Sequence, residues 1–193
     1  METDFFDVFD YLLEDPVLNK NSNQERKGMA KTESNMLALE TKAPNFKLYD
    51  TISSESIELS KYPIKKGVVI MFICNHCPYV IHLNSALVKI ANDYEKKGIT
   101  FLAISSNDVE TYPQDGPDLM KKHALEAQYP FPYLYDETQD VAKAYKAACT
   151  PDFYLFDAQL LLQYRGQFDA SRPGNTLPVN AYHLKTAMDN LLE

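Results

Sequence analysis

The chain has 193 residues, of which 45% are hydrophobic, so it can bury one substantial core, and its length favours a single domain with an appendage. The formal net charge of −8, with 19 Lys and Arg against 27 Asp and Glu, argues against a nucleic-acid partner, which would need clustered positive charge. No stretch approaches the roughly 18 apolar residues that span a bilayer, and the first residues lack the basic and apolar segments of a secretion signal. We therefore expect a cytoplasmic protein with no membrane partner.

The chain begins with an appendage. Residues 1–18 carry six acidic side chains and no basic one, and their apolar residues recur at helical spacing, which predicts an acidic amphipathic helix. Residues 19–35 are polar and read as a flexible linker. The domain itself is expected to cover residues 36–193. The helix is either a dispensable extension or a docking segment for a partner, and the sequence leaves both readings open.

Within the domain, short apolar runs alternate with helical patterns. The expected strands are residues 46–50, 57–62, 68–73, 99–105, 133–135, 152–157 and 160–167, and the expected helices are residues 80–98, 117–128, 141–147 and 181–192. The run 68–73 is continuously apolar, which is typical of a central strand covered on both faces. The order predicts an α/β fold in which helices flank a central mixed β-sheet that starts with a β-hairpin.

Two cysteines, Cys74 and Cys77, stand between the buried strand and the helical pattern that follows it. The start of a helix offers backbone N–H groups and the positive end of the helix dipole, and both stabilise a thiolate. We therefore expect Cys74 to be an exposed nucleophilic thiol with a lowered pKa, and Cys77, within one helical turn, to be its resolving partner. His76 is expected to lower the pKa of Cys74 further; the alternative is a solvated residue at the helix start.

A metal site is the main alternative use of these cysteines. Structural zinc takes four ligands, commonly in two pairs, but the rest of the chain supplies only one further cysteine and scattered histidines. A close cysteine pair between a buried strand and a helix therefore favours redox use. We expect neither a cofactor nor a bound metal ion.

Three segments carry a resemblance to a known family: residues 43–48 (APNFKL), residues 74–80 (CNHCPYV) and Thr150-Pro151. Together they resemble the thioredoxin-like redoxins, which include alkyl hydroperoxide reductase and thiol-specific antioxidant relatives, and more narrowly a bacterial CNHCPYV-type subgroup. The likeness covers about residues 36–193. It implies a thioredoxin-like fold in which Pro151 is a cis-proline facing the two cysteines, with Thr150 and Pro151 contacting substrate.

The same resemblance implies an activity. We expect a thiol:disulfide oxidoreductase with an antioxidant role that acts on protein or small-molecule disulfides and thiols and is recycled by a cellular thiol reductant. The likeness would also bring Cys149 close to the cysteine pair. Cys149 is then either a third thiol that traps Cys74 or Cys77, or a small buried residue that packs under its loop.

The chain departs from its expected relatives at several positions. Thioredoxins usually carry Trp before the first cysteine and a buried acid six positions earlier, where this chain has Ile73 and Val68. Peroxiredoxins usually supply a threonine and an arginine to activate peroxide, where this chain has Met71 and Pro151. A dedicated peroxidase is therefore disfavoured. A peroxiredoxin-type peroxidase and a thioredoxin-fold copper carrier are kept as alternatives.

Overall fold

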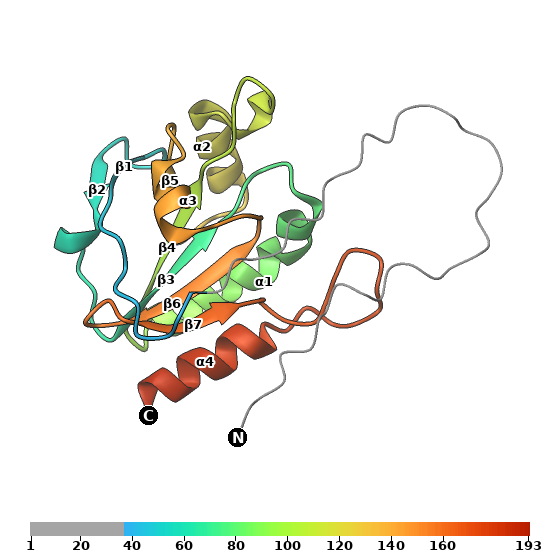
Figure 1. The fold of residues 1–193 in the computed structure, drawn as a ribbon. Helices are drawn as coiled ribbons and strands as arrows, with labels where there is room; N and C mark the ends of the chain where they lie inside the picture. The colour runs from blue at the N-terminus through green and yellow to red at the C-terminus, as the bar shows by residue number, and fades with distance from the viewer. Residues whose placement is uncertain (1–36) are drawn as a thin grey trace. The chain divides into compact units, whose positions relative to one another are not determined.

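The computed structural model describes residues 37–193 (Figure 1). The predicted acidic helix of residues 1–18 and the predicted linker of residues 19–35 lie outside the described residues. The domain boundaries therefore stay a prediction, and the fold below is that of the described part of the chain alone.

Within residues 37–193, one mixed sheet has seven strands in the order β2-β1-β5-β4-β3-β6-β7. The strands are β1 (Lys47–Asp50), β2 (Ser56–Glu58), β3 (Gly67–Phe72), β4 (Ile99–Ser105), β5 (Tyr133–Tyr135), β6 (Asp152–Asp157) and β7 (Leu162–Gly166). Strand β3 pairs in parallel with β4 and antiparallel with β6, and β4 pairs in parallel with β5. The carboxyl ends of β3, β4 and β5 therefore meet at one edge of the sheet.

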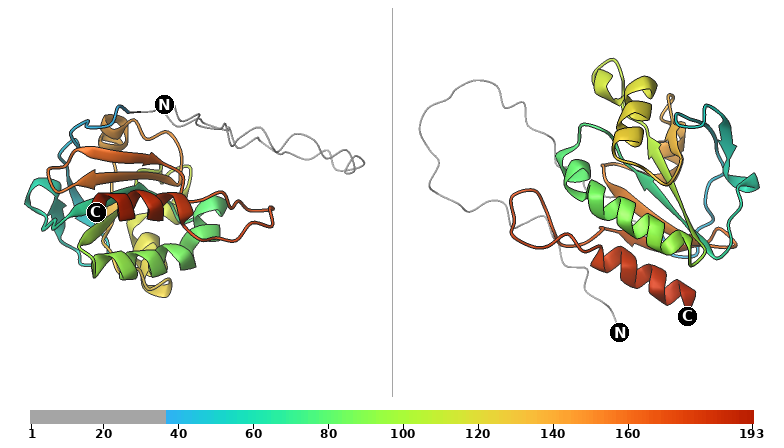
Figure 2. Two further views of the ribbon diagram at one scale, coloured as in Figure 1. Left: turned by 90° about the horizontal axis from the view of Figure 1, so that it is seen from below. Right: turned by 180° about the vertical axis from the view of Figure 1, so that it is seen from behind.

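Helices cover both faces of this sheet. They are α1 (Pro78–Glu95), α2 (Pro117–Glu126), α3 (Asp140–Tyr145) and α4 (Tyr182–Leu192), with short 3₁₀ turns η2 (Leu59–Lys61) and η3 (Pro113–Asp115). Buried residues of α1, α2 and α4 form one apolar cluster with the sheet, and α3 contributes to a second. Figure 2 shows α1 and α4 on the same side of the sheet. This arrangement confirms the predicted class, a central mixed sheet flanked by helices.

Strand β3 is the centre of the core. All six of its residues are buried, because alternate side chains face the two apolar clusters. Val69 and Met71 pack on the face of α1, whereas Val68, Ile70 and Phe72 pack on the opposite face. The apolar run of residues 68–73 therefore predicted the strand correctly, and the strand carries the chain from the core to the sheet edge where the cysteines lie.

Two predicted elements differ from the observed ones by three residues or more at one end, and the others agree to within two residues. The strand expected over residues 57–62 ends at Glu58 and is followed by η2, whose Leu59 turns into the core at 1% exposure. The helix expected to end at Gly98 ends at Glu95.

Among the described residues, none of the helices has the length and apolar character needed to cross a membrane.

Candidate active site

The cysteine pair lies in the short loop between β3 and α1. Cys74 is 1% exposed and Cys77 is 7% exposed. The expectation of an exposed nucleophilic Cys74 is therefore wrong, because β3 and its neighbours carry the loop into the apolar cluster beneath α1. Neither sulfur is oxidised here, and both cysteines are free.

Thr150 contacts both sulfurs. The Thr150–Pro151 peptide bond is cis, as the resemblance implied. The Thr150 hydroxyl lies 3.4 Å from Cys74 Sγ, and the Cys77 thiol donates to the Thr150 carbonyl oxygen at 3.2 Å. The structure thus brings Thr150 of the cis-proline loop next to Cys74 and Cys77, which precede it in the chain by 76 and 73 residues. Contact of Thr150 and Pro151 with a substrate stays a prediction.

The structure changes the expected pKa of each thiol. Helix α1 begins at Pro78, and Cys77, not Cys74, is its N-cap residue. The hydrogen bond with Cys74, followed by bonds from Thr150 and from the backbone N–H groups of Val80 and Tyr79, lowers the pKa of Cys77 to about 5.

The same hydrogen bond has the opposite effect on the first cysteine. Together with burial and the negative charge of Asp115, it raises the pKa of Cys74 above its ordinary value. The expectation that the helix start lowers the pKa of Cys74 is therefore wrong. Near neutral pH Cys74 therefore keeps its proton, and Cys77 donates to the Thr150 carbonyl only in the fully protonated dithiol.

Asp115 anchors the loop that holds the cysteines. Its side chain is fully buried, and it accepts hydrogen bonds from the Asn75 backbone N–H at 2.7 Å and from Asn107 Nδ2 at 2.8 Å. His76 Nδ1 lies 2.5 Å from Oδ2 of the same carboxylate, the oxygen that also accepts from Asn107. The sequence analysis missed Asp115, which lies 39 residues after His76. Its position in the segment after β4 could have indicated that it lies near the cysteines, since the parallel strands β3 and β4 end at the same edge of the sheet.

His76 is held on two sides. Besides its contact with Asp115, its ring stacks on Tyr112, with centroids 4.4 Å apart and the planes 9° apart. Its side chain is 29% exposed. The structure therefore does not show a freely solvated residue at the helix start, and the predicted effect of His76 on the thiols stays a prediction.

Cys149 lies beside the pair in a different setting. Burial, followed by the charge of Asp152, raises its pKa to about 11, so it is a protonated thiol at neutral pH. Below it, the fully buried Arg165 bonds to Asp152 at 2.8 Å and to the Lys146 carbonyl at 2.9 Å. This buried ion pair fixes the segment that leads from α3 to the cis-proline.

One group of side chains brings possible metal donors together. Within residues 37–193, donor atoms of Cys74, His76 and Asp115 lie within 4.8 Å of one another. Both oxygens of Asp115 already accept hydrogen bonds, and His76 Nδ1 faces one of them. The Asp115 carboxylate therefore already binds His76 and two amide donors, and the Cys74 sulfur contacts Thr150 instead.

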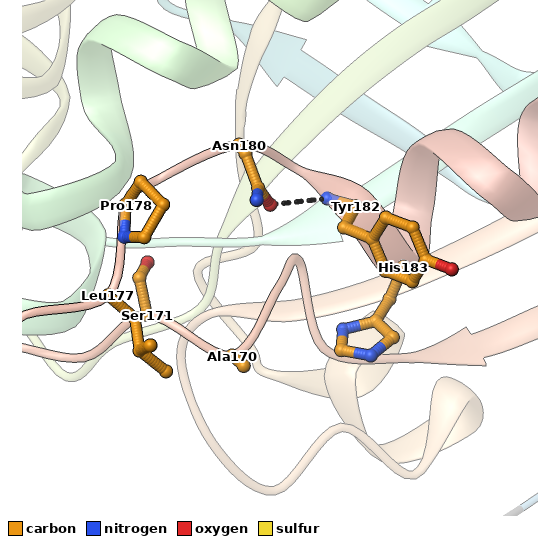
Figure 3. A pocket seen from close by; sticks show the side chains of 7 residues that line it. All are labelled: Ala170, Ser171, Leu177, Pro178, Asn180, Tyr182 and His183. Carbon is orange, nitrogen blue, oxygen red and sulfur yellow. Dashed lines mark hydrogen bonds between the residues drawn. The ribbon is translucent and has the colours of Figure 1, made fainter.

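A cavity of about 210 Å³ lies elsewhere, between the segment after β7 and the start of α4 (Figure 3). Its lining consists of Ala170, Ser171, Leu177, Pro178, Asn180, Tyr182 and His183. The Asn180 side chain accepts from the backbone N–H of Tyr182 at 3.0 Å, as Figure 3 shows. No residue of the cysteine loop or of the cis-proline loop lines this cavity, so it is separate from the thiol chemistry.

Known proteins resemble the chain over most of its length. The AhpC/TSA family matches residues 39–165. A crystal structure of a conserved protein from Geobacillus kaustophilus is 55% identical, with a TM-score of 0.79 over 82% of this chain and 84% of that one. A hypothetical protein from Sinorhizobium meliloti 1021 is 41% identical, with a TM-score of 0.81 over 84% and 88% of the two chains.

A more distant structure shares the fold alone. The thioredoxin domain of a thiol-disulfide oxidoreductase from Bacteroides vulgatus is 19% identical, with a TM-score of 0.60 over 78% of this chain and 98% of that one. No curated protein matches the sequence. The solved structures therefore confirm the predicted thioredoxin-like fold.

Proposed function

This chain belongs to the AhpC/TSA family, and from that membership and the geometry of its cysteines we propose that it is a thiol:disulfide oxidoreductase whose redox pair is Cys74 and Cys77. The observation that carries the proposal is the contact of both sulfurs with one residue. Thr150 lies 3.4 Å from Cys74 Sγ through its hydroxyl and 3.2 Å from Cys77 Sγ through its carbonyl. The two reacting atoms are thereby held at one place beside the cis-proline.

The reaction follows from this arrangement. Once a base has taken its proton, the Cys74 sulfur attacks a substrate disulfide, forms a mixed disulfide and releases the first substrate thiol. Cys77 then attacks the Cys74 sulfur, forms the Cys74–Cys77 disulfide and releases the second substrate thiol. The substrate gains two electrons, the pair loses two, and the protons of the dithiol end on the released thiols.

We further propose that the protein works in the cytoplasm, where a cellular thiol reductant restores the dithiol.

A thiol-dependent peroxidase is the other activity in view. Such an enzyme needs a donor that polarises the peroxide, typically a guanidinium beside the reactive sulfur. Within residues 37–193 the sequence has two arginines. Arg165 is bound to Asp152, and Arg172 donates to the carbonyl oxygens of Asp169 and Ser171. Because Arg165 is fully buried in an ion pair with Asp152 and Arg172 is held by backbone carbonyls, the described site favours disulfide exchange over peroxide reduction.

The test compares two activities of the full chain. With dithiothreitol as electron donor, reduction of insulin should require both thiols of the pair, so that Cys74→Ser and Cys77→Ser each abolish it. Cys149→Ser is the matched control and should retain most of the wild-type rate. Loss of activity in the control equal to that in Cys74→Ser would contradict the assignment of the pair. A second-order rate constant for peroxide consumption of about 10⁷ M⁻¹s⁻¹, in the upper range of kcat/KM values for enzymes, would instead identify a peroxidase.

A further inference from the structure

We propose that His76 and Asp115 form a proton relay for the cysteine pair: His76 takes the proton that the pair retains and passes it to the departing substrate thiolate, while Asp115 holds the imidazole in position. The inference rests on the proposed disulfide exchange and adds the route of the proton to it. In this relay His76 is the group that exchanges the proton, and Asp115 is a positioning residue.

The need for a proton acceptor comes from the sulfurs themselves. Closing the Cys74–Cys77 disulfide removes both protons of the dithiol. One is lost readily, because the pKa of Cys77 is lowered to about 5, but the other is retained, because burial and the shared hydrogen bond raise the pKa of Cys74. A base beside the pair is therefore required when the Cys74 sulfur attacks the substrate near neutral pH.

His76 is placed to be that base. One ring nitrogen of His76, the Cys74 sulfur and an Asp115 oxygen lie within 4.8 Å of one another, so the ring and the sulfur are close enough for one bridging water to join them. With its Nδ1 proton donated to Asp115 at 2.5 Å, the neutral imidazole keeps Nε2 as an acceptor. Its 29% exposure leaves the ring open to solvent and to a bound substrate.

Asp115 fixes the ring and stabilises the imidazolium. Its carboxylate is fully buried, and among the ion pairs of the described residues it pairs only with His76. Two neutral donors, the Asn75 N–H and Asn107 Nδ2, complete its hydrogen bonds. A buried carboxylate without Lys or Arg gains most from a proton that arrives on its histidine partner.

The groups that face His76 come from two segments. Asp115 and the ring of Tyr112 lie on the segment that precedes α2, and Cys74 lies on the cysteine loop two residues before His76.

The relay also supplies a proton-exchanging group where the chain lacks the usual one. The buried acid that thioredoxins carry six residues before the first cysteine is replaced here by Val68, which is fully buried in the opposite apolar cluster.

The experiment measures single-turnover oxidation of the reduced full chain by two disulfides between pH 5.5 and 8.5. Oxidised glutathione has a leaving thiolate of high pKa that needs a proton, whereas 5,5′-dithiobis(2-nitrobenzoic acid) has one of low pKa that leaves without it. We expect His76→Ala to slow the reaction with oxidised glutathione at least ~10-fold, a modest part of the ~10²–10⁴-fold that general acid–base catalysis contributes. The aryl disulfide should be slowed much less, and added imidazole should restore part of the glutathione rate.

Two further variants separate the relay from a structural effect. Asp115→Asn keeps an acceptor oxygen for the Asn75 N–H but removes the charge, and it should show the same selective loss with oxidised glutathione. Asp108→Asn removes an exposed carboxylate that bonds to Thr111 and Glu110 in the same loop, and its rates should match the wild type. Thermal unfolding of each variant reports whether the fold is intact.

Three results would overturn the relay. The first is an oxidation rate of His76→Ala within twofold of the wild-type rate at every pH. The second is an equal loss of rate with both disulfides in either variant. The third is a loss of rate in Asp115→Asn with no loss in His76→Ala. Failure of the proposed function is a different outcome, because it would appear as a wild-type chain that does not reduce disulfides or as full activity in Cys74→Ser.

Discussion

Thr150 is the residue on which both sulfurs depend most directly. Its hydroxyl and its carbonyl reach different cysteines, so the side chain and the backbone of one residue act on the two members of the pair. The hydroxyl bond lowers the pKa of Cys74, in opposition to burial. A substitution that removes the hydroxyl and keeps the shape of the side chain therefore isolates this contribution.

The first prediction concerns that hydroxyl. Thr150→Val should raise the pKa values of the pair by about one unit, since a hydrogen bond to a charged group is worth about 1.5–3 kcal/mol and one pKa unit corresponds to about 1.4 kcal/mol. Alkylation by iodoacetamide as a function of pH, followed by mass spectrometry, measures the shift. Thr150→Ser keeps the hydroxyl and is the control. An unchanged profile in the valine variant would show that the 3.4 Å contact does not stabilise the thiolate.

A second prediction concerns the pH dependence of the thiols in the wild-type chain. Because the pKa of Cys77 is lowered to about 5, its thiolate is present above that pH, and alkylation of the reduced pair should fall as the pH drops through about 5. Cys149, with a pKa raised to about 11, should react appreciably only in strongly alkaline solution. Peptide mapping of alkylated cysteines assigns each profile. A first transition near pH 9 at the pair would show that the helix start does not activate it.

At the scale of elements, the segment between α3 and β6 must be held firmly, because it presents Thr150 and Pro151 to the cysteines. Arg165 on β7 reaches beneath it to Asp152 at the start of β6 and to the carbonyl of Lys146 at the end of α3. The Tyr154 hydroxyl donates to the same carboxylate at 2.8 Å. One buried ion pair thus joins two strands and a helix below the site.

The third prediction tests this buried ion pair. Arg165→Met should lower the free energy of unfolding by about 3–5 kcal/mol, because it leaves the buried Asp152 carboxylate without its cation. The double variant Arg165→Met/Asp152→Leu removes both charges and should recover much of that loss. Urea unfolding of the reduced chain measures all three proteins. A double variant no more stable than the single one would show that the loss comes from packing and not from the unpaired charge.

At the scale of the whole molecule, the site lies where the parallel strands end. The carboxyl end of β3 supplies the cysteine loop, and the segment after β4 supplies Asp115, so the chemistry is assembled at one edge of the sheet. Residues 37–193 supply the cysteine loop, Asp115, the cis-proline loop and both apolar clusters.

The fourth prediction follows from this placement. A chain of residues 36–193 should fold cooperatively and retain the insulin reductase rate of the full chain within about twofold, since two-state folding is usual for one core of this size. Circular dichroism, thermal unfolding and the reductase assay compare the two proteins. An unfolded or inactive shortened chain would show that residues before the predicted boundary at 36 contribute to the domain, and would contradict the predicted division.

Much of this protein follows from the sequence because the relevant signals are local. The apolar run of residues 68–73 determined the buried central strand, and the order of the patterns determined the α/β class, since hydrophobic periodicity reports which faces are covered. The spacing of Cys74 and Cys77 predicted two neighbouring thiols, and the resemblance at Thr150-Pro151 anticipated the cis bond. Each of these depends on residues that are neighbours in the chain or on a recognised motif.

What the tertiary structure decided is the environment of those residues. The burial of both sulfurs, the N-cap position of Cys77 and the pairing of His76 with Asp115 depend on where one helix turn begins and on how two loops meet. Periodicity locates helix boundaries only to within a few residues, and it carries no information about which side chain from a distant loop will fill a hydrogen bond. The N-cap position falls on Cys77, three residues after Cys74, and the hydrogen bond with Cys74 together with the backbone N–H groups of Val80 and Tyr79 lowers the pKa of Cys77, because helix-end effects extend over a single turn.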